Sequence, residues 1–153
     1  MKKKKKAKNE GGQILTGGKN VVVPGEFSRG WYIAPTVIEG LGADCQTNQE
    51  EIFGPVVTIQ SFNSDDEALK LANSTRYGLA ASLWTTDAER IKWFSQALEV
   101  GVVWVNTWMA RDLRTPFGGV KESGVGREGG KFALQFFSEI KNVCIKDHQG
   151  EQA

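Results

Sequence analysis

Two adjacent carboxylates stand just before a glycine–proline break in residues 50–56 (EEIFGPV). Proline fixes its own φ and disfavours a helical conformation in the residue before it, so the break ends one segment and starts the apolar run that follows. We therefore expect Glu51 and Phe53 on a rigid turn at the mouth of a strand, with Gly54 supplying backbone angles that its neighbours could not adopt. Neighbouring carboxylates rarely converge, so we interpret Glu50 as a solvated charge and Glu51 as a ligand contact, for example to ribose hydroxyls.

A second group of candidates lies in residues 108–117 (WMARDLRTPF). Arg111 and Arg114 could each capture a carboxylate through the planar fork of a guanidinium. The alternative is a surface ion pair with Asp112, which would contribute little to stability. Phe117 stands on a stiff Pro-Phe-Gly-Gly turn and either fills the core or forms the wall of a pocket.

The histidine and the two cysteines give no catalytic or metal site in the sequence. His148 is the single histidine, so Ser-His-Asp and Cys-His catalysis are not expected unless the C-terminal end folds back onto a nucleophile. Cys144 and His148 are four residues apart, and two ligands do not make a zinc site, so no metal is expected. Cys144 lies in an apolar run and is predicted to be a buried packing residue, whereas Cys45 has no obvious cationic activator.

Residues 124–129 (GVGREG) match the G-x-G-x-x-G pattern of dinucleotide-binding loops. Residues 120–123 do not read as a strand, and too little chain follows for a strand–helix–strand unit with its acidic residue. We therefore reject a dinucleotide fingerprint here and expect a tight helix start whose backbone N–H groups could face an anion.

An alternation of strands and helices must position these candidates. A strand over 56–62 precedes a helix that starts at the Ser64 capping box, and a strand over 79–84 precedes a helix that starts at the Thr86 capping box. A strand over 102–105 completes the pattern, which predicts an α/β fold with a parallel sheet and right-handed crossovers.

The flanking segments are less regular. We expect strands at 13–16, at 31–38 (disturbed by Pro35) and at 142–146, a short helical turn within 40–49, and a helix over 126–137. A terminal strand must pair with the sheet or with another subunit.

Bulk properties limit the class of protein. A length of 153 residues favours one domain with a sizeable core, and a net charge of +1 gives no reason to expect nucleic-acid or membrane-surface binding. No apolar run approaches the roughly 20 residues that span a bilayer. Two cysteines and no secretion signal favour a reducing, cytoplasmic location. Residues 1–11 are lysine-rich and are predicted to be a disordered tail.

Seven motifs in order resemble the C-terminal part of the aldehyde dehydrogenase superfamily. They are 13–18 (QILTGG), 35–37 (PTV), 50–56 (EEIFGPV), 77–81 (YGLAA), 101–106 (GVVWVN), 116–119 (PFGG) and 123–128 (SGVGRE). Within that family, residues 108–117 resemble the 2-aminomuconic and 2-hydroxymuconic semialdehyde dehydrogenases, whose substrates carry a carboxylate.

The resemblance implies an enzyme that oxidises aldehydes to acids with NAD or NADP through a cysteine nucleophile. It implies that Glu51 binds the nicotinamide ribose, that Phe53 packs near the nicotinamide, that Arg111 lines the substrate tunnel and that Phe117 lies close to the reacting centre. It also implies subunit pairing through the terminal strand, and hence a homo-oligomer.

The same resemblance divides the chain into a tail (1–11), a partial catalytic domain (12–138), an oligomerisation strand (139–147) and a frayed end (148–153). In the family, the nucleophilic cysteine, the glutamate base and the dinucleotide-binding domain precede the EEIFGPV motif, so no catalytic residue is assigned here and Cys45 does not take that role. Two hypotheses follow: a portion of an aldehyde dehydrogenase that is inactive alone and binds NAD(P) weakly or not at all, or a non-catalytic copy that acts as an interaction module.

Overall fold

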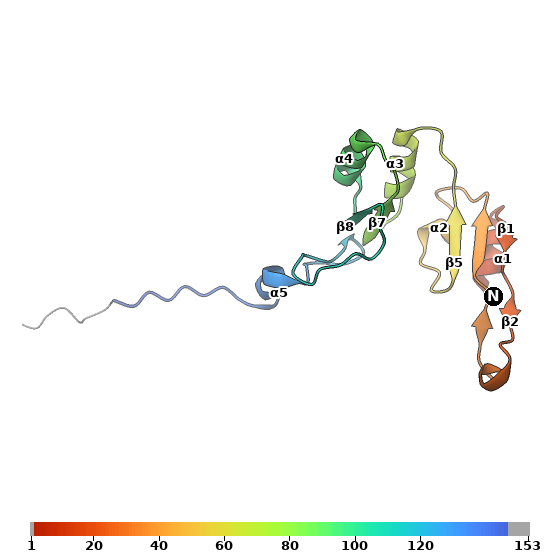
Figure 1. The fold of residues 1–153 in the computed structure, drawn as a ribbon, viewed down its shortest axis with the longest axis horizontal. Helices are drawn as coiled ribbons and strands as arrows, with labels where there is room; N and C mark the ends of the chain where they lie inside the picture. The colour runs from red at the N-terminus through yellow and green to blue at the C-terminus, as the bar shows by residue number, and fades with distance from the viewer. Residues whose placement is uncertain (1, 147–153) are drawn as a thin grey trace, which may run out of the picture.

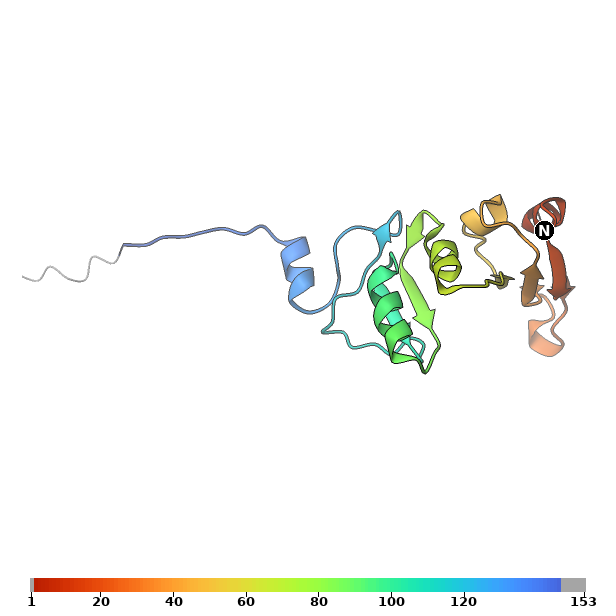
Figure 2. The same ribbon diagram turned by 90° about the horizontal axis from the view of Figure 1, so that it is seen from above.

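The computed structural model describes residues 2–146. Its elements form two groups along a long axis, followed by a short helix and an extended segment (Figures 1 and 2). Strands in parallel pairs alternate with helices in both groups, which confirms the predicted α/β class.

The first group is built on a three-stranded sheet in the order β1-β4-β5. Strand β4 is antiparallel to β1 and parallel to β5, with Thr36 opposite Val56. Its elements are α1 (Lys2–Asn9), β1 (Gln13–Thr16), β2 (Asn20–Val21), the 3-10 helix η1 (Gly25–Phe27), β3 (Tyr32–Ile33), β4 (Thr36–Glu39), α2 (Gln46–Gln49) and β5 (Val56–Ile59). The predicted strand 31–38 is split at Pro35 into β3 and β4, as a residue without a backbone N–H requires.

One face of this sheet is covered and the other is bare. Ala7 of α1, Ile38 of β4 and Leu41 form a buried cluster on the covered face. Leu15, Val57 and Ile59 are each about half exposed on strands whose side chains alternate between the faces. The strand predicted over 56–62 therefore ends at Ile59 and is not buried throughout.

The lysine run is a helix, so the disordered tail predicted for residues 1–11 is wrong over Lys2–Asn9. Lysine is a good helix former, and Ala7 is completely buried against the sheet. The Glu10 carboxylate that follows accepts hydrogen bonds from Gln46 N and Thr47 N, each at 3.2 Å, which ties α1 to the start of α2.

The second group has two capped helices and a parallel strand pair. It contains α3 (Asp65–Asn73), β6 (Tyr77–Gly78), β7 (Ala80–Leu83), α4 (Ala88–Ala97), β8 (Val102–Val105) and β9 (Val120–Lys121). Ser64 caps α3 as predicted, whereas Asp87 rather than Thr86 caps α4, because its carboxylate accepts from the N–H groups of Glu89 and Arg90.

The single sheet predicted through all three strands is wrong. β5 pairs with β4, and β7 pairs with β8, in two separate sheets. Local patterns set each strand and helix, but the neighbour of a strand is set by contacts distant in sequence, which periodicity does not report.

The C-terminal region departs from prediction in two places. Helix α5 spans Gly130–Phe137 and starts later than expected, after Gly126 (φ +71°) and Gly129 (φ +96°), whose backbone angles are not helical. Residues 139–146 form no strand and are exposed, because no neighbouring strand within residues 2–146 pairs with them. Cys144, predicted to be buried, is therefore exposed, and His148 lies outside the described residues.

Candidate functional site

The turn before β5 holds Phe53 in a strained conformation. Its φ is +54°, in the left-handed region that bulky side chains rarely adopt, and the residue is 90% exposed. A hydrogen bond from Val56 N to the Gly54 carbonyl (2.7 Å) and one from Thr36 N to the Pro55 carbonyl (2.8 Å) fix the turn against β4. The unusual angles that we expected at Gly54 are thus carried by Phe53, which presents an aromatic face to solvent.

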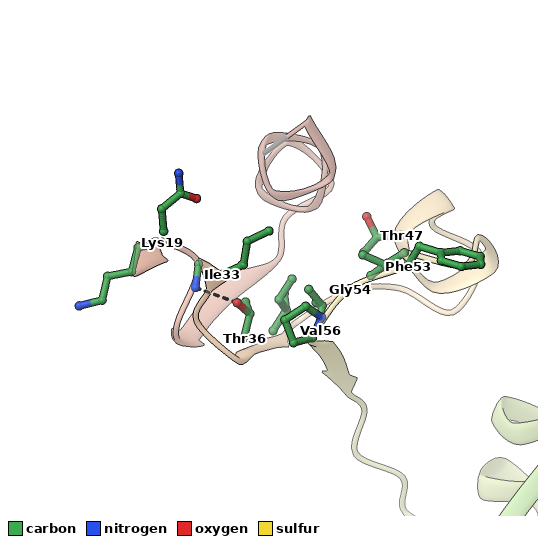
Figure 3. Close-up of a pocket in the computed structure, with 12 residues that line it drawn as sticks. Lys19, Ile33, Thr36, Thr47, Phe53, Gly54 and Val56 are labelled. Carbon is green, nitrogen blue, oxygen red and sulfur yellow. Dashed lines mark hydrogen bonds between the residues drawn. The ribbon is translucent and has the colours of Figure 1, made fainter. Parts of the chain in front are cut away.

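A cavity of about 190 Å³ lies behind this turn, at the start of β4 and β5. Figure 3 shows the side chain of Thr36 facing it, and the Phe53 ring and the Lys19 side chain directed away from it. Thr36 Oγ1 accepts a hydrogen bond from Gly18 N at 2.8 Å. Phe53 is nevertheless one of the residues that line this cavity, together with Gly54 and Pro55 of the same turn.

Glu51 faces the second group of elements. It lines a cavity of about 540 Å³ together with residues of β6 and β7 and with Glu122 and Ser123. Phe117 lines a neighbouring cavity of about 320 Å³, and the two cavities share Leu79 and Ser123. Glu51 and Phe117 thus line two neighbouring cavities, and neither cavity is lined by Phe53 or Arg111.

The structure brings Arg111 and Phe117 together. The guanidinium carbon of Arg111 lies 4.3 Å from the centroid of the Phe117 ring. Arg111 Nη2 also donates to Glu128 Oε1 at 2.5 Å. Glu128 is a site residue that the sequence did not indicate, since it lies 17 residues from Arg111 in a loop without periodicity.

The loop that carries Arg111 is held against β8. Asn106, with φ +52°, pairs its side-chain amide with the backbone N–H and carbonyl of Thr85 at 2.9 and 2.8 Å. The buried Trp104 indole donates its N–H to the Ala110 carbonyl at 2.9 Å. These bonds fix the backbone at Asn106 and at Ala110, the residue next to Arg111.

Arg114 takes the other of the two roles foreseen for the arginines. Its guanidinium hydrogen-bonds to Asp112, which lowers the pKa of the Asp112 carboxyl and raises the pKa of Arg114. Arg114 is largely exposed, so this is a surface ion pair of little energetic weight.

Within residues 2–146, neither cysteine is hydrogen-bonded to a cationic side chain or to a general base. Cys45 is half-buried at the start of α2, and Cys144 has Asn142 Oδ1 as its hydrogen-bond acceptor at 3.7 Å. Within residues 2–146, no three His, Cys, Asp or Glu side chains gather as metal ligands would, and no helix has the length and apolar composition needed to cross a membrane.

Known proteins are similar to this chain in sequence and in fold. Residues 1–143 match the model of the aldehyde dehydrogenase family. The chain is 49% identical over 140 residues to the 2-aminomuconic 6-semialdehyde dehydrogenase of Pseudomonas sp., covering 92% of this chain and 28% of that relative. It is 48% identical over 141 residues to the 2-hydroxymuconic semialdehyde dehydrogenase of Pseudomonas sp. (strain CF600), covering 92% and 29%.

A solved structure superposes over most of the chain. It is a mutant indole-3-acetaldehyde dehydrogenase of P. syringae in complex with NAD+ and IAA, with a TM-score of 0.83 at 36% identity. The match covers 90% of this chain and 27% of that one. The chain therefore spans less than a third of the length of the relatives it matches.

Proposed function

The chain belongs to the aldehyde dehydrogenase family, and on that premise we propose that it supplies one side of the active site of an NAD(P)-dependent enzyme that oxidises a carboxylated semialdehyde to the acid. The observation that carries the proposal is the Arg111 guanidinium stacked on Phe117, on a loop fixed from β8. A planar cation held on an aromatic face is suited to bind a carboxylate. Two relatives named for muconic semialdehydes support the same substrate class.

Glu51 and Phe53 are proposed to hold the nicotinamide end of the cofactor. An exposed ring on a fixed turn can pack on a flat heterocycle, and a carboxylate two residues away can accept ribose hydroxyls. When bound, NAD(P) supplies the hydride acceptor. The contribution of this chain is to orient that cofactor and to position the carboxylate end of the aldehyde relative to it.

We propose that the 153 residues alone turn over no aldehyde. Neither cysteine is hydrogen-bonded to a cationic side chain or a general base among the residues that the structure describes, and such a partner is what activates a thiol. The two unpaired cysteines also support a reducing location such as the cytoplasm.

A hybrid enzyme tests this proposal. The aligned 140-residue segment of the Pseudomonas 2-aminomuconic 6-semialdehyde dehydrogenase would be replaced by the matching residues of this chain. The hybrid should form NADH from 2-hydroxymuconic semialdehyde, whereas the chain alone should form none. A folded hybrid without activity, or turnover by the chain alone that Cys45→Ala abolishes, would contradict the proposal.

Residues 139–146 are proposed to pair with a second copy of the chain. Ile140, Val143 and Ile145 are 92%, 64% and 85% exposed on an extended backbone. An unpaired apolar segment of this kind is a ready partner for a free strand edge.

A further inference from the structure

Arg111 already holds a carboxylate within the chain. Its Nη2 donates to Glu128 Oε1 at 2.5 Å while the guanidinium carbon lies over the Phe117 ring. Glu128 thus pairs with the Arg111 guanidinium, the group that is proposed above to bind the carboxylate of the substrate.

The backbone positions Glu128 independently of Arg111. Phe117 and Glu128 form an antiparallel bridge with two hydrogen bonds, each of 2.8 Å between N and O. The Arg111 backbone is held separately, through Ala110 and the Trp104 indole. Breaking the side-chain pair would therefore leave both backbone segments in place.

A ligand carboxylate can also readily replace Glu128 in its ion pair with Arg111. The Arg111 side chain is 37% exposed and that of Glu128 is 58% exposed, and ion pairs so open to water are only weakly favourable. Glu128 engages the guanidinium through one oxygen and one nitrogen, whereas a free carboxylate can bind the fork through two parallel hydrogen bonds. The guanidinium carbon lies over the Phe117 ring, and the guanidinium N–H groups donate to whichever carboxylate is bound.

We propose that Glu128 is a specificity-determining residue that competes with the substrate carboxylate for Arg111 and so sets the affinity of the site for acidic ligands. Displacement of Glu128 places two carboxylates near one guanidinium, and their repulsion opposes binding. A ligand that forms the bidentate pair overcomes this opposition, whereas one with a poorly placed carboxylate does not. The inference rests on the proposed function, because it needs Arg111 to be the carboxylate-binding residue.

The test is an NMR titration of the whole 153-residue chain with muconate, a stable dicarboxylate, and with the neutral muconamide as control ligand. The signal followed is the Arg111 Nε–H resonance, assigned by its loss in Arg111→Gln. Glu128→Gln removes the competing charge at nearly constant shape. Glu99→Gln is the matched control, since Glu99 is 59% exposed and pairs with Lys121 away from Arg111.

We expect Glu128→Gln to tighten muconate binding about 2- to 5-fold, the range that corresponds to an exposed ion pair. Glu99→Gln should leave muconate binding unchanged, and muconamide should not distinguish the variants. Binding that depends on Arg111 but is equal or weaker in Glu128→Gln would overturn this inference and leave the proposed function standing.

Failure of muconate to shift the Arg111 resonance in both the wild type and Glu128→Gln would remove the proposed function and the inference together. If Glu128→Gln does not fold, Glu128→Asp withdraws the carboxylate from Arg111 at constant charge, and it should tighten binding in the same direction. A merely structural role for Glu128 would lower stability in these variants without raising muconate affinity.

Discussion

Phe53 combines a backbone conformation that costs free energy with a ring that is almost fully exposed. The ring makes too little contact within the chain to offset the strain, so the turn itself must impose the conformation. Such strain is found where a side chain has to be aimed at a ligand, which is the role proposed for Phe53.

Two substitutions at Phe53 distinguish the free-energy cost of the backbone strain from the effect of losing the ring. Phe53→Gly should be more stable than Phe53→Ala by up to about 1 kcal/mol, because both lack the ring but only glycine adopts a positive φ without penalty. For a chain of this length the difference corresponds to a rise in melting temperature of about 2–4 °C. Equal melting temperatures would show that the left-handed conformation is not strained.

The two arginines show how far residue types alone could be interpreted. From the sequence, each arginine could either bind a ligand carboxylate or form a surface ion pair. In the structure, Arg114 forms the surface ion pair with Asp112. Arg111 and Phe117 were both foreseen as pocket residues, and they are in contact. Glu128 was not, because its partner lies across a loop whose folding follows no spacing rule.

The helices are the elements that local sequence predicts best. Ser64 was expected to cap α3, and its hydroxyl accepts a hydrogen bond from Glu67 N at 3.2 Å. Ser64→Ala should destabilise the chain by about 1 kcal/mol, the usual cost of a lost N-cap. Thermal unfolding checks this against Ser61→Ala, an exposed serine just upstream that caps no helix. An equal loss in both variants would argue against the cap.

The tie between α1 and α2 predicts an acid-sensitive element. The Thr47 hydroxyl donates to the Glu10 carboxylate at 2.5 Å, and this bond, with the backbone bonds from Thr47 and Gln46, lowers the Glu10 pKa from 4.5. A lowered folded-state pKa stabilises the fold above the ordinary value, and the stabilisation is lost as pH falls through the folded-state value.

Glu10→Gln and Thr47→Val should therefore each reduce stability near neutral pH and make stability less sensitive to acid below about 4.5, the ordinary pKa of a glutamate carboxyl. Thermal melts across the acid range measure both effects. If the two variants lose stability with acid as steeply as the wild type does, the Glu10–Thr47 bond does not couple the helices.

Strand pairing marks where prediction from sequence fails. β5 and β7 were each foreseen, yet they belong to separate sheets. Likewise, the apolar pattern of residues 142–146 suits a strand, but a strand forms only beside a neighbour, and none among residues 2–146 is available to it. In both cases the missing information is the identity of a distant partner.

The whole molecule exposes far more surface than its size requires. Its accessible area is 12071 Å², whereas a compact monomer of 16.8 kDa would expose about 7,600 Å². The sizeable core expected from the length is therefore not present, and only five buried apolar residues were found among those described: Ala7, Ile38, Leu41, Phe94 and Trp104. Apolar exposure on this scale marks surfaces that other chains or segments cover.

We accordingly expect the chain to self-associate as its concentration rises. A variant that ends at Ser138 removes the exposed apolar segment and should associate less, but still measurably, because the bare face of the β1-β4-β5 sheet remains. Sedimentation velocity over a concentration series measures both. A chain that stays monomeric throughout would contradict this account of its surface.

Arg111 is proposed to recognise the carboxylate of an acidic aldehyde. The most direct measurement is the ratio of kcat/KM for 2-hydroxymuconic semialdehyde to that for a neutral aldehyde in the hybrid enzyme, with and without Arg111→Ala. Loss of a hydrogen bond to a charged group should lower kcat/KM for the acidic substrate about 10- to 100-fold and change that for the neutral aldehyde little. Equal losses on the two substrates would contradict the claim.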